Sequence, residues 1–314
     1  AATDNDPVAR WNHPAWWVQR LRKDHPQHWE QILQANNAHA PMVLRVNEQK
    51  CTVAQYLHAL GAINLEASAV GEHGVALHQA VPVQSLPHFA EGWVSVQDAA
   101  AQQAAPLLLQ GLDLRQPLRV LDACAAPGGK TAHLLEMAGP QSPLQVTALE
   151  IDATRSARIG ETLQRLGLKA QVLVADAARP QDWWQSECGG VQFDAILLDA
   201  PCTASGIVRR HPDVRLLRRE SDIAQLATLQ AALLKALWPL LRPGGRLLYC
   251  TCSVFRAEGD AQVQTFLAHN TDAQLLPSPG HLIPGNADKV GAVPDNLTGD
   301  HDGFFYALLQ KSAQ

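Results

Sequence analysis

Two cysteines of this chain each follow an apolar run that is typical of a buried strand. Cys202 comes shortly after the run Phe193–Leu198, in Asp-Ala-Pro-Cys-Thr-Ala-Ser-Gly, and Cys252 directly follows the run Arg246–Thr251. A thiolate is a strong nucleophile that needs no metal and can add to an electron-poor ring carbon. An isolated cysteine is more often a buried apolar residue, by about four to one. The catalytic interpretation therefore requires a fold that brings both thiols together.

A glycine-containing loop, Asp122-Ala-Cys-Ala-Ala-Pro-Gly-Gly-Lys-Thr131, lies between a predicted strand and a predicted helix. Glycines let the backbone approach a ligand, and a helix N-terminus presents free N–H groups to negative charge. A phosphate loop would need glycine where Cys124 stands, and the spacing is not that of a dinucleotide fingerprint. The loop therefore predicts a nucleoside-bearing ligand without a pyrophosphate. The alternative is a turn that only packs the helix on the sheet.

Four acids follow predicted strands: Asp122, Glu150, Asp176 and Asp199. Glu150 comes 21 residues after Gly129, about where an acid reaches the hydroxyls of a ribose. Ligands of open α/β sheets bind at the carboxyl ends of the strands. A single acid there could merely cap the next helix. Four of them at one edge favour a binding crevice.

From residue 117 onward, predicted strands alternate with helices. The predicted strands are Leu118–Ala123, Val146–Ile151, Ala170–Ala175, Phe193–Leu198 and Arg246–Thr251, and the helices are Lys130–Ala138, Ala153–Leu166 and Ile223–Leu241. This alternation predicts a doubly wound, mostly parallel α/β sheet. In the strand order 3-2-1-4-5 the fourth and fifth strands are neighbours, so Cys202 and Cys252 are expected to face one cleft.

Residues 1–100 have a different pattern and predict a small α/β module, ahead of a larger domain over 101–314. Met42–Val46 and Gly74–His78 are predicted strands, with a helix near Val53–Leu60 between them. Trp17 and Leu21 are spaced i, i+4, which predicts that one face of the first long helix is buried.

The composition excludes several classes of protein. Of 314 residues 46% are hydrophobic and 18% are charged, which rules out a disordered chain, and the net charge of −5 gives no global attraction to nucleic acid. No apolar run approaches the roughly 18–20 residues of a membrane helix. Six scattered cysteines without a Cys-x-x-Cys pair predict a reducing cytoplasmic compartment and no metal site. The polar, acidic first residues predict no targeting signal, and the absence of an initial Met indicates that residues precede Ala1.

The chain closely resembles the Sun-type family of RNA cytosine-C5 methyltransferases. Five segments carry the resemblance, which spans nearly the whole chain: Ala126–Thr131, Leu198–Gly206, Thr251–Ser253, Arg209–Asp213 and Asp302–Tyr306. The last two segments are most similar to the bacterial 16S ribosomal RNA branch. The resemblance implies a class I (Rossmann-like) methyltransferase fold, preceded by a small RNA-recognition-like domain. Members of that branch usually carry a further helical domain upstream.

The resemblance also implies a role for each site residue. Cys252 corresponds to the nucleophile that bonds C6 of cytosine, and Cys202 to the cysteine linked with product release. S-adenosyl-L-methionine (SAM) is expected in the loop of Cys124, Ala125, Ala126, Pro127, Gly128, Gly129 and Lys130, with Glu150 on the ribose and Asp176 facing the adenine. Asp199 is expected between cofactor and base, assisted by Lys130, and is our candidate for the acid near N3.

The RNA contacts rest on charge alone. Arg209, Arg210 and Arg215 border the loop of Cys202 and could contact phosphates, although a solvated helix face with internal ion pairs explains them equally well. The expected partner is RNA, with 16S ribosomal RNA favoured, and the expected state is a monomer without membrane or metal contacts.

Three functions therefore stay open. The first is an RNA cytosine-C5 methyltransferase, which explains both cysteines. The second is a class I methyltransferase for another RNA, such as tRNA, or for a substrate that is not RNA. The third is an RNA-binding scaffold without activity.

Overall fold

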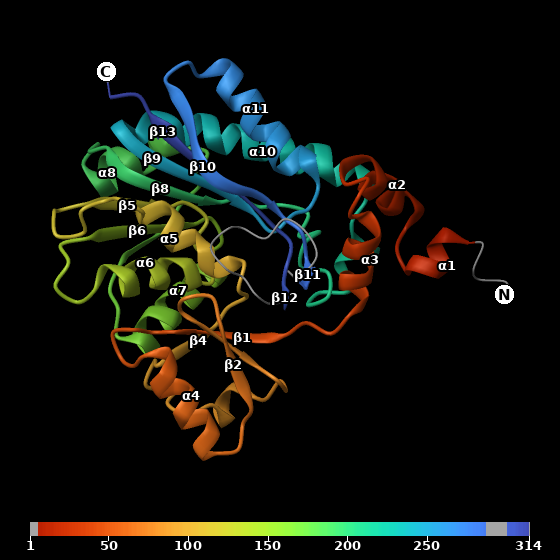
Figure 1. Ribbon diagram of the computed structural model, residues 1–314. Helices are drawn as coiled ribbons and strands as arrows, with labels where there is room; N and C mark the ends of the chain where they lie inside the picture. Colours follow the sequence, from red (N-terminus) through yellow and green to blue (C-terminus); the bar gives the residue numbers. More distant parts are fainter. Residues whose placement is uncertain (1–5, 287–299, 314) are drawn as a thin grey trace.

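The computed structural model describes residues 6–286 and 300–313 (Figure 1). The helices are α1 (Pro7–Trp11), α2 (Ala15–Asp24), α3 (Trp29–Asn37), α4 (Val53–Ala62), α5 (Ala104–Leu109), α6 (Gly129–Ala138), α7 (Ala153–Leu166), α8 (Trp184–Cys188), α9 (Val214–Leu217), α10 (Glu220–Leu237) and α11 (Asp260–His269). The strands are β1 (Met42–Val46), β2 (Ala67–Val70), β3 (Gly74–Leu77), β4 (Val94–Val96), β5 (Arg119–Asp122), β6 (Gln145–Glu150), β7 (Gln171–Val174), β8 (Phe193–Asp199), β9 (Leu241–Thr251), β10 (Ala273–Leu282), β11 (Gly285–Asn286), β12 (Asp300–His301) and β13 (Phe304–Lys311).

A seven-stranded sheet of order β10-β13-β9-β8-β5-β6-β7 forms the centre of the larger domain. Its five parallel strands are the five predicted ones, and their predicted order, 3-2-1-4-5, is confirmed. Beyond β9 the sheet gains two strands that the sequence analysis missed, because β13 pairs antiparallel with β9 and β10 pairs antiparallel with β13.

Helices cover both faces of this sheet, with α5, α6 and α7 on one face and α10 and α11 on the other (Figure 1). Alternate residues of β8 therefore enter two cores: Ile196 and Leu198 pack with α10, while Ala195 and Leu197 pack with α5 and α6. A strand buried on both faces has to be apolar throughout, which is why Phe193–Leu198 shows almost no polar alternation.

Two features around α10 correct the sequence analysis. By length and composition alone, Glu220–Leu240 could cross a membrane, with a mean hydropathy of 1.2, whereas no such stretch was expected. Leu233, Leu234 and Leu237 are buried against the sheet, as in the core helix of a globular domain. In addition β9 begins at Leu241 rather than at Arg246, because its pairing with β8 shifts register near the start and accommodates the Pro-Gly-Gly turn.

The smaller domain is a four-stranded antiparallel sheet of order β2-β3-β1-β4, with α4 packed on one face. Thr52 and Gln55 form a reciprocal capping box that starts α4. Leu44 of β1, Tyr56 of α4 and Val75 of β3 are fully buried in its core. The predicted small α/β module thus exists, built from residues 42–96.

Helices α1–α3 pack on the larger domain instead, beside the loops that follow β8 and β9. Trp17 lies with its ring centroid 5.1 Å from that of Phe255, and both share a core with Leu21 and Val208. The predicted burial of Trp17 and Leu21 is confirmed, since neither is exposed. The boundary of the small module at residues 1–100 stays a prediction. Periodicity predicts that a helix face is buried but not which element it packs against.

A buried ion pair joins the two domains. Arg45 of β1 donates from Nε and Nη2 to the two carboxylate oxygens of Glu136 in α6, at 2.9 and 3.0 Å. A further nitrogen of Arg45, Nη1, donates to the carbonyl of Gly129 at 3.0 Å. The smaller domain therefore contacts the first turn of the helix that follows the glycine-containing loop.

We predict that Glu136→Ala destabilises the protein by about 3–5 kcal/mol, because it leaves the guanidinium of Arg45 buried without its counter-ion. Urea denaturation followed by circular dichroism measures this loss. The control is Glu161→Ala on the exposed face of α7, which is expected to change stability by less than about 0.5 kcal/mol. Equal losses in the two variants would contradict the role of the pair.

Candidate active site

The structure brings the two cysteines together at the carboxyl end of the parallel sheet. The Sγ atoms of Cys202 and Cys252 lie 3.4 Å apart, and both residues are half-buried. The backbone N–H of Gly206 donates to the carbonyl of Cys252 at 2.9 Å, which fixes the two loops to each other. The pKa of Cys202 is raised well above its usual value, first by its hydrogen bond to Cys252 and then by burial. Cys202 is thus a neutral thiol in contact with the sulfur of Cys252.

An ion pair lies in the same crevice. The Nζ atom of Lys130, in the first turn of α6, is 2.6 Å from a carboxylate oxygen of Asp199 at the end of β8. The side chain of Lys130 is 14% exposed and that of Asp199 is 27% exposed. Burial is the largest single influence and lowers the pKa of Lys130, but the charge and the hydrogen bond of Asp199, together with the nearby Cys250 and Cys252, raise that pKa above its usual value. Lys130 therefore stays charged and fixes the orientation of Asp199.

Asp122 at the end of β5 is fully buried beneath the glycine-containing loop. Its Oδ2 accepts a hydrogen bond from the hydroxyl of Thr131 at 2.6 Å, while its Oδ1 has no partner among the described residues. Burial, with a smaller contribution from the nearby Asp199, raises the pKa of Asp122 to about 7. A buried acceptor of this kind fits a ligand that brings a hydrogen-bond donor or a positive charge.

The loop itself follows a path that its glycine requires. Gly128 has a φ of +97°, and a Cβ atom there would lie 3.1 Å from Cα of Ile159 in α7. The backbone N–H of Ala125 is bonded to the carbonyl of Leu149 in β6, which anchors the loop to the neighbouring strand. Burial raises the pKa of Cys124, so its thiol stays neutral and is not a nucleophile.

The remaining two acids lie at the ends of the next strands. Glu150 is buried, accepting from the backbone N–H of Asp152 at 3.1 Å and pairing with Arg155 at 3.3 Å. Asp176 is half-buried, and one of its oxygens accepts from the backbone N–H of Ala178 at 2.9 Å. Together with Asp122 and Asp199, they give the edge a row of carboxylates, as the sequence analysis expected.

The three arginines that were predicted to bind RNA have different partners in the structure. The side chain of Arg209 is only 2% exposed and pairs with Asp300 and Asp302, each at 2.7 Å. Arg210 bonds to Asp302, to Asp98 and to the carbonyl of Pro41. The placement of Arg209 and Arg210 therefore does not support contacts with phosphate, because distant acids in the sequence neutralise both guanidiniums.

Arg215 differs from these two, since it is half-buried and donates to the side chain of Asn37 at 2.7 Å. Its guanidinium has no carboxylate partner among the described ion pairs, so its positive charge is not neutralised. Arg215 stays a candidate for contact with RNA.

Sequence reasoning missed two features that shape the cysteine loops. Gly206 and Gly303 touch so closely that a Cβ atom on Gly206 would lie 2.0 Å from the carbonyl oxygen of Gly303. Glu258 is fully buried and accepts hydrogen bonds from Thr203 and Ser253, the residues that follow the two cysteines. The only sequence signal was an acid six residues after Cys252, and no spacing rule assigns a role to it.

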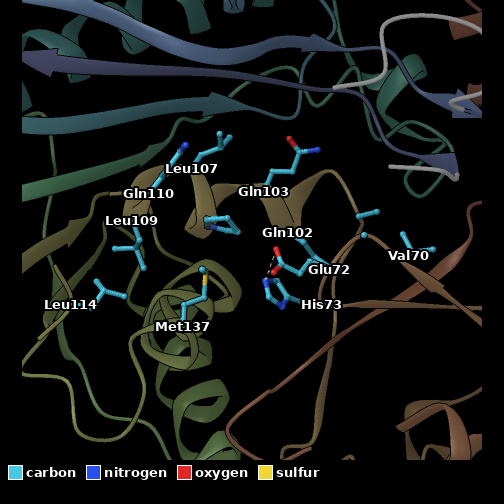
Figure 2. A pocket seen from close by; sticks show the side chains of 13 residues that line it. Val70, Glu72, His73, Gln102, Gln103, Leu107, Leu109, Gln110, Leu114 and Met137 are labelled. Carbon is cyan, nitrogen blue, oxygen red and sulfur yellow. Dashed lines mark ion pairs between the residues drawn. The ribbon is translucent and has the colours of Figure 1, made fainter. Parts of the chain in front are cut away.

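A cavity of about 660 Å³ is lined by residues other than those of this crevice, and Figure 2 shows its lining side chains. It lies between the β2–β3 hairpin and the helices α5 and α6, and its lining combines apolar side chains with amides, among them Leu107, Met137, Gln102 and Gln103. None of the predicted site residues lines it.

The fold and the crevice define the class of protein: a Rossmann-like methyltransferase with a small antiparallel domain attached. The family model described as 16S rRNA methyltransferase RsmB/F matches residues 109–310, and a model for the ferredoxin-like domain of such proteins matches residues 13–84. The chain therefore belongs to the RsmB/F family of 16S rRNA methyltransferases.

Similar proteins agree with this assignment. The chain is 47% identical to ribosomal RNA small subunit methyltransferase B of Pseudomonas syringae pv. tomato and to that of Vibrio cholerae, in each case over 99% of this chain and 68% of the relative. Among solved structures, a methyltransferase homologue from Pyrococcus horikoshii is 26% identical, with a TM-score of 0.77 over 98% of both chains.

We predict that the stability advantage of the parent over Asp122→Asn shrinks as the pH rises from 5 to 8. The pKa of Asp122 is about 7 in the folded protein and 3.8 in a free chain, so the folded state binds more protons in this interval. Its contribution to stability is then fully present below pH 3.8 and is lost as the pH rises through 7.

Thermal midpoints of the two proteins at pH 5, 6, 7 and 8 measure the effect. The control is Asp113→Asn, since Arg115 lowers the pKa of the exposed Asp113 and this acid stays ionised throughout. A difference between parent and Asp122→Asn that does not change with pH would contradict the prediction.

Proposed function

We propose that this chain methylates C5 of a cytosine in 16S ribosomal RNA, with SAM as methyl donor, through a covalent bond between Cys252 and C6 of the base. The observation that carries the proposal is the contact of the two thiols, 3.4 Å apart, beside the pair of Lys130 and Asp199. A class I methyltransferase that acts on a better nucleophile has no use for two thiols at adjacent strand ends.

The chemistry of cytosine explains why a thiol is needed. C5 of cytosine is a poor nucleophile, and addition of the Cys252 thiolate at C6 turns the C5–C6 unit into an enamine whose C5 is nucleophilic. When bound, SAM supplies an electrophilic methyl group. Asp199 is proposed to contact N3 of the base, and the ammonium of Lys130, 2.6 Å from its carboxylate, is proposed to supply the proton that Asp199 passes to N3 to stabilise the adduct.

The second thiol acts after methyl transfer. Water takes the C5 proton, the electron pair of the C5–H bond forms the C5–C6 double bond, and the sulfur of Cys252 leaves with the electron pair of its bond to C6 and receives a proton. We assign this release to Cys202, because it is the group in contact with the sulfur of Cys252 that can exchange a proton.

The residues of the crevice fit the cofactor. We propose that residues 124–130 surround it, that Glu150 holds the ribose hydroxyls and that Asp176 faces the adenine. The Oδ1 atom of the buried Asp122, which has no partner among the described residues, is proposed to accept from the positively charged amino group in the methionine part of SAM.

The catalytic unit is proposed to consist of residues 101–314 together with α1–α3, and the four-stranded domain is proposed to contact RNA. The target cytosine has to turn out of its stack to reach Cys252, because neighbouring bases cover its ring carbon C6 in a base-paired RNA helix. We also propose that the protein is a monomer and acts in the cytoplasm. The cytoplasmic location agrees with six cysteines that form no disulfide.

We predict that RNA containing 5-fluorocytidine forms a covalent complex with the protein in the presence of SAM. Fluorine at C5 cannot leave as a proton, so the adduct persists and is seen as a slower band on a denaturing gel. Cys252→Ala is expected to abolish the band, while Cys188→Ala, which removes a buried thiol of α8, is expected to retain it. Methyl transfer without an adduct would favour another methyltransferase mechanism, and RNA binding with neither would favour a scaffold.

We further predict that Cys202→Ala accumulates a protein–RNA adduct on ordinary RNA with SAM, because addition at C6 remains possible while release is slowed. The measurement is the fraction of protein that runs as the slower protein–RNA band on a denaturing gel. Samples are taken after a time in which the parent completes several turnovers. Equal fractions of adduct in parent and variant would contradict the proposed role of Cys202 in product release.

A further inference from the structure

Glu258 lies at the end of the loop that follows β9, with no exposed surface. Its carboxylate contacts both cysteine loops at the residues that directly follow the cysteines. Oε1 accepts from the backbone N–H of Thr203 at 2.9 Å, and Oε2 accepts from the hydroxyl of Ser253 at 2.6 Å. The hydroxyl of Thr203 is a third donor, to Oε2.

The backbone of Glu258 is itself fixed to β9. Its carbonyl accepts from the hydroxyl of Tyr249 at 2.8 Å and from that of Thr251 at 3.3 Å. From the other side, the amide nitrogen of Gln230 in α10 donates to Oε1 at 3.1 Å and to the carbonyl of Pro201 at 2.9 Å. The carboxylate therefore cannot move independently of the strand that carries Cys252.

The loop of Cys202 needs such a restraint. Ala204 has a φ of +60°, in the left-handed region that residues other than glycine rarely adopt. The hydroxyls of Ser205 and Ser253 are 2.9 Å apart, so the turn is bonded on both sides of Ala204. A strained turn persists only where its surroundings fix it, and the carboxyl group of Glu258 bonds to both cysteine loops.

We propose that Glu258 is a positioning residue that sets the separation of the two thiols. This inference rests on the proposed function, in which release of the product requires Cys202 beside Cys252. Addition of the base needs Cys252 alone, so loss of the restraint is expected to slow release more than addition.

The separation of the thiols can be measured without RNA or cofactor. A diazene dicarboxamide oxidant takes two electrons and two protons from a pair of thiols, is reduced to the hydrazine, and leaves one disulfide. The rate of closure between Cys202 and Cys252 in the full chain, followed by mass spectrometry of peptides, depends on how often the two sulfurs meet.

The main test is the matched pair Thr203→Val and Thr203→Ser. Valine keeps the shape of threonine and its backbone N–H bond to Oε1 of Glu258, but it lacks the hydroxyl that donates to Oε2. Serine keeps that hydroxyl. We expect closure to slow about tenfold in Thr203→Val, as for loss of a hydrogen bond to a charged group, and by less than about twofold in Thr203→Ser.

Glu258→Gln tests the carboxylate directly. Its charge also raises the pKa of Cys202, so this variant changes ionisation as well as position, and its closure is compared at several pH values. Glu136→Gln is the control for loss of a buried carboxylate outside the cysteine loops. In this variant the disulfide between Cys202 and Cys252 is expected to form at the parent rate.

A second readout separates positioning from general loss of structure. With RNA and SAM, Thr203→Val is expected to accumulate more adduct than Thr203→Ser, as Cys202→Ala does, with unchanged formation of the 5-fluorocytidine complex. Closure at the parent rate in both Thr203→Val and Glu258→Gln overturns the inference. If no adduct forms in any variant, the proposed function fails while the closure rates still decide the role of Glu258.

Discussion

The parallel pairing of β8 with β9 places Asp199 opposite Cys250, and the geometry of the crevice depends on this register. Cys202 comes three residues after Asp199 and Cys252 two residues after Cys250, so the two chains leave the sheet side by side and their sulfurs meet. A shift by one residue would turn Asp199 to the other face of the sheet, away from Lys130. Cores on both faces of β8 resist such a shift, and packing far from the crevice thereby preserves its chemistry.

Buried charge supplies a second level of organisation. Asp302 accepts from both Arg209 and Arg210, and Arg210 also reaches Asp98. These pairs connect the loop after Cys202, the end of the small domain and the start of β13. Buried arginines are strongly destabilising without their acids, so the segments are held in one arrangement. Arg209 and Arg210, beside the candidate active site, thus stabilise the fold, and their charges are paired within the protein.

The sequence predicted the five parallel strands, their order and the edge at which the acids lie. Apolar runs that alternate with helices and are separated by turn residues are compatible with few folds other than a doubly wound parallel sheet. It did not predict β13 and β10, since antiparallel strands added at an edge follow no βαβ pattern. The burial of Trp17 was predictable, but its contact with Phe255 was not. The run at Arg209 has the same pattern whether its charges meet phosphates or distant carboxylates, and only the fold shows the carboxylates. Glu258 has no motif, and its place becomes evident only when two loops far apart in sequence converge on it.

The ends of the four-stranded domain lie next to each other: the N–H of Gln97 bonds to the carbonyl of Val43 at 3.0 Å, and Arg210 contacts both Pro41 and Asp98. Since α1–α3 precede this domain and pack beside the loops that follow β8 and β9, the four strands lie between two segments of chain that pack on each other. Insertions with adjacent ends can be exchanged or lost with little disturbance to their host. If the domain contacts RNA as proposed, its replacement would change which RNA is bound, while the residues around Cys202 and Cys252 stay unchanged.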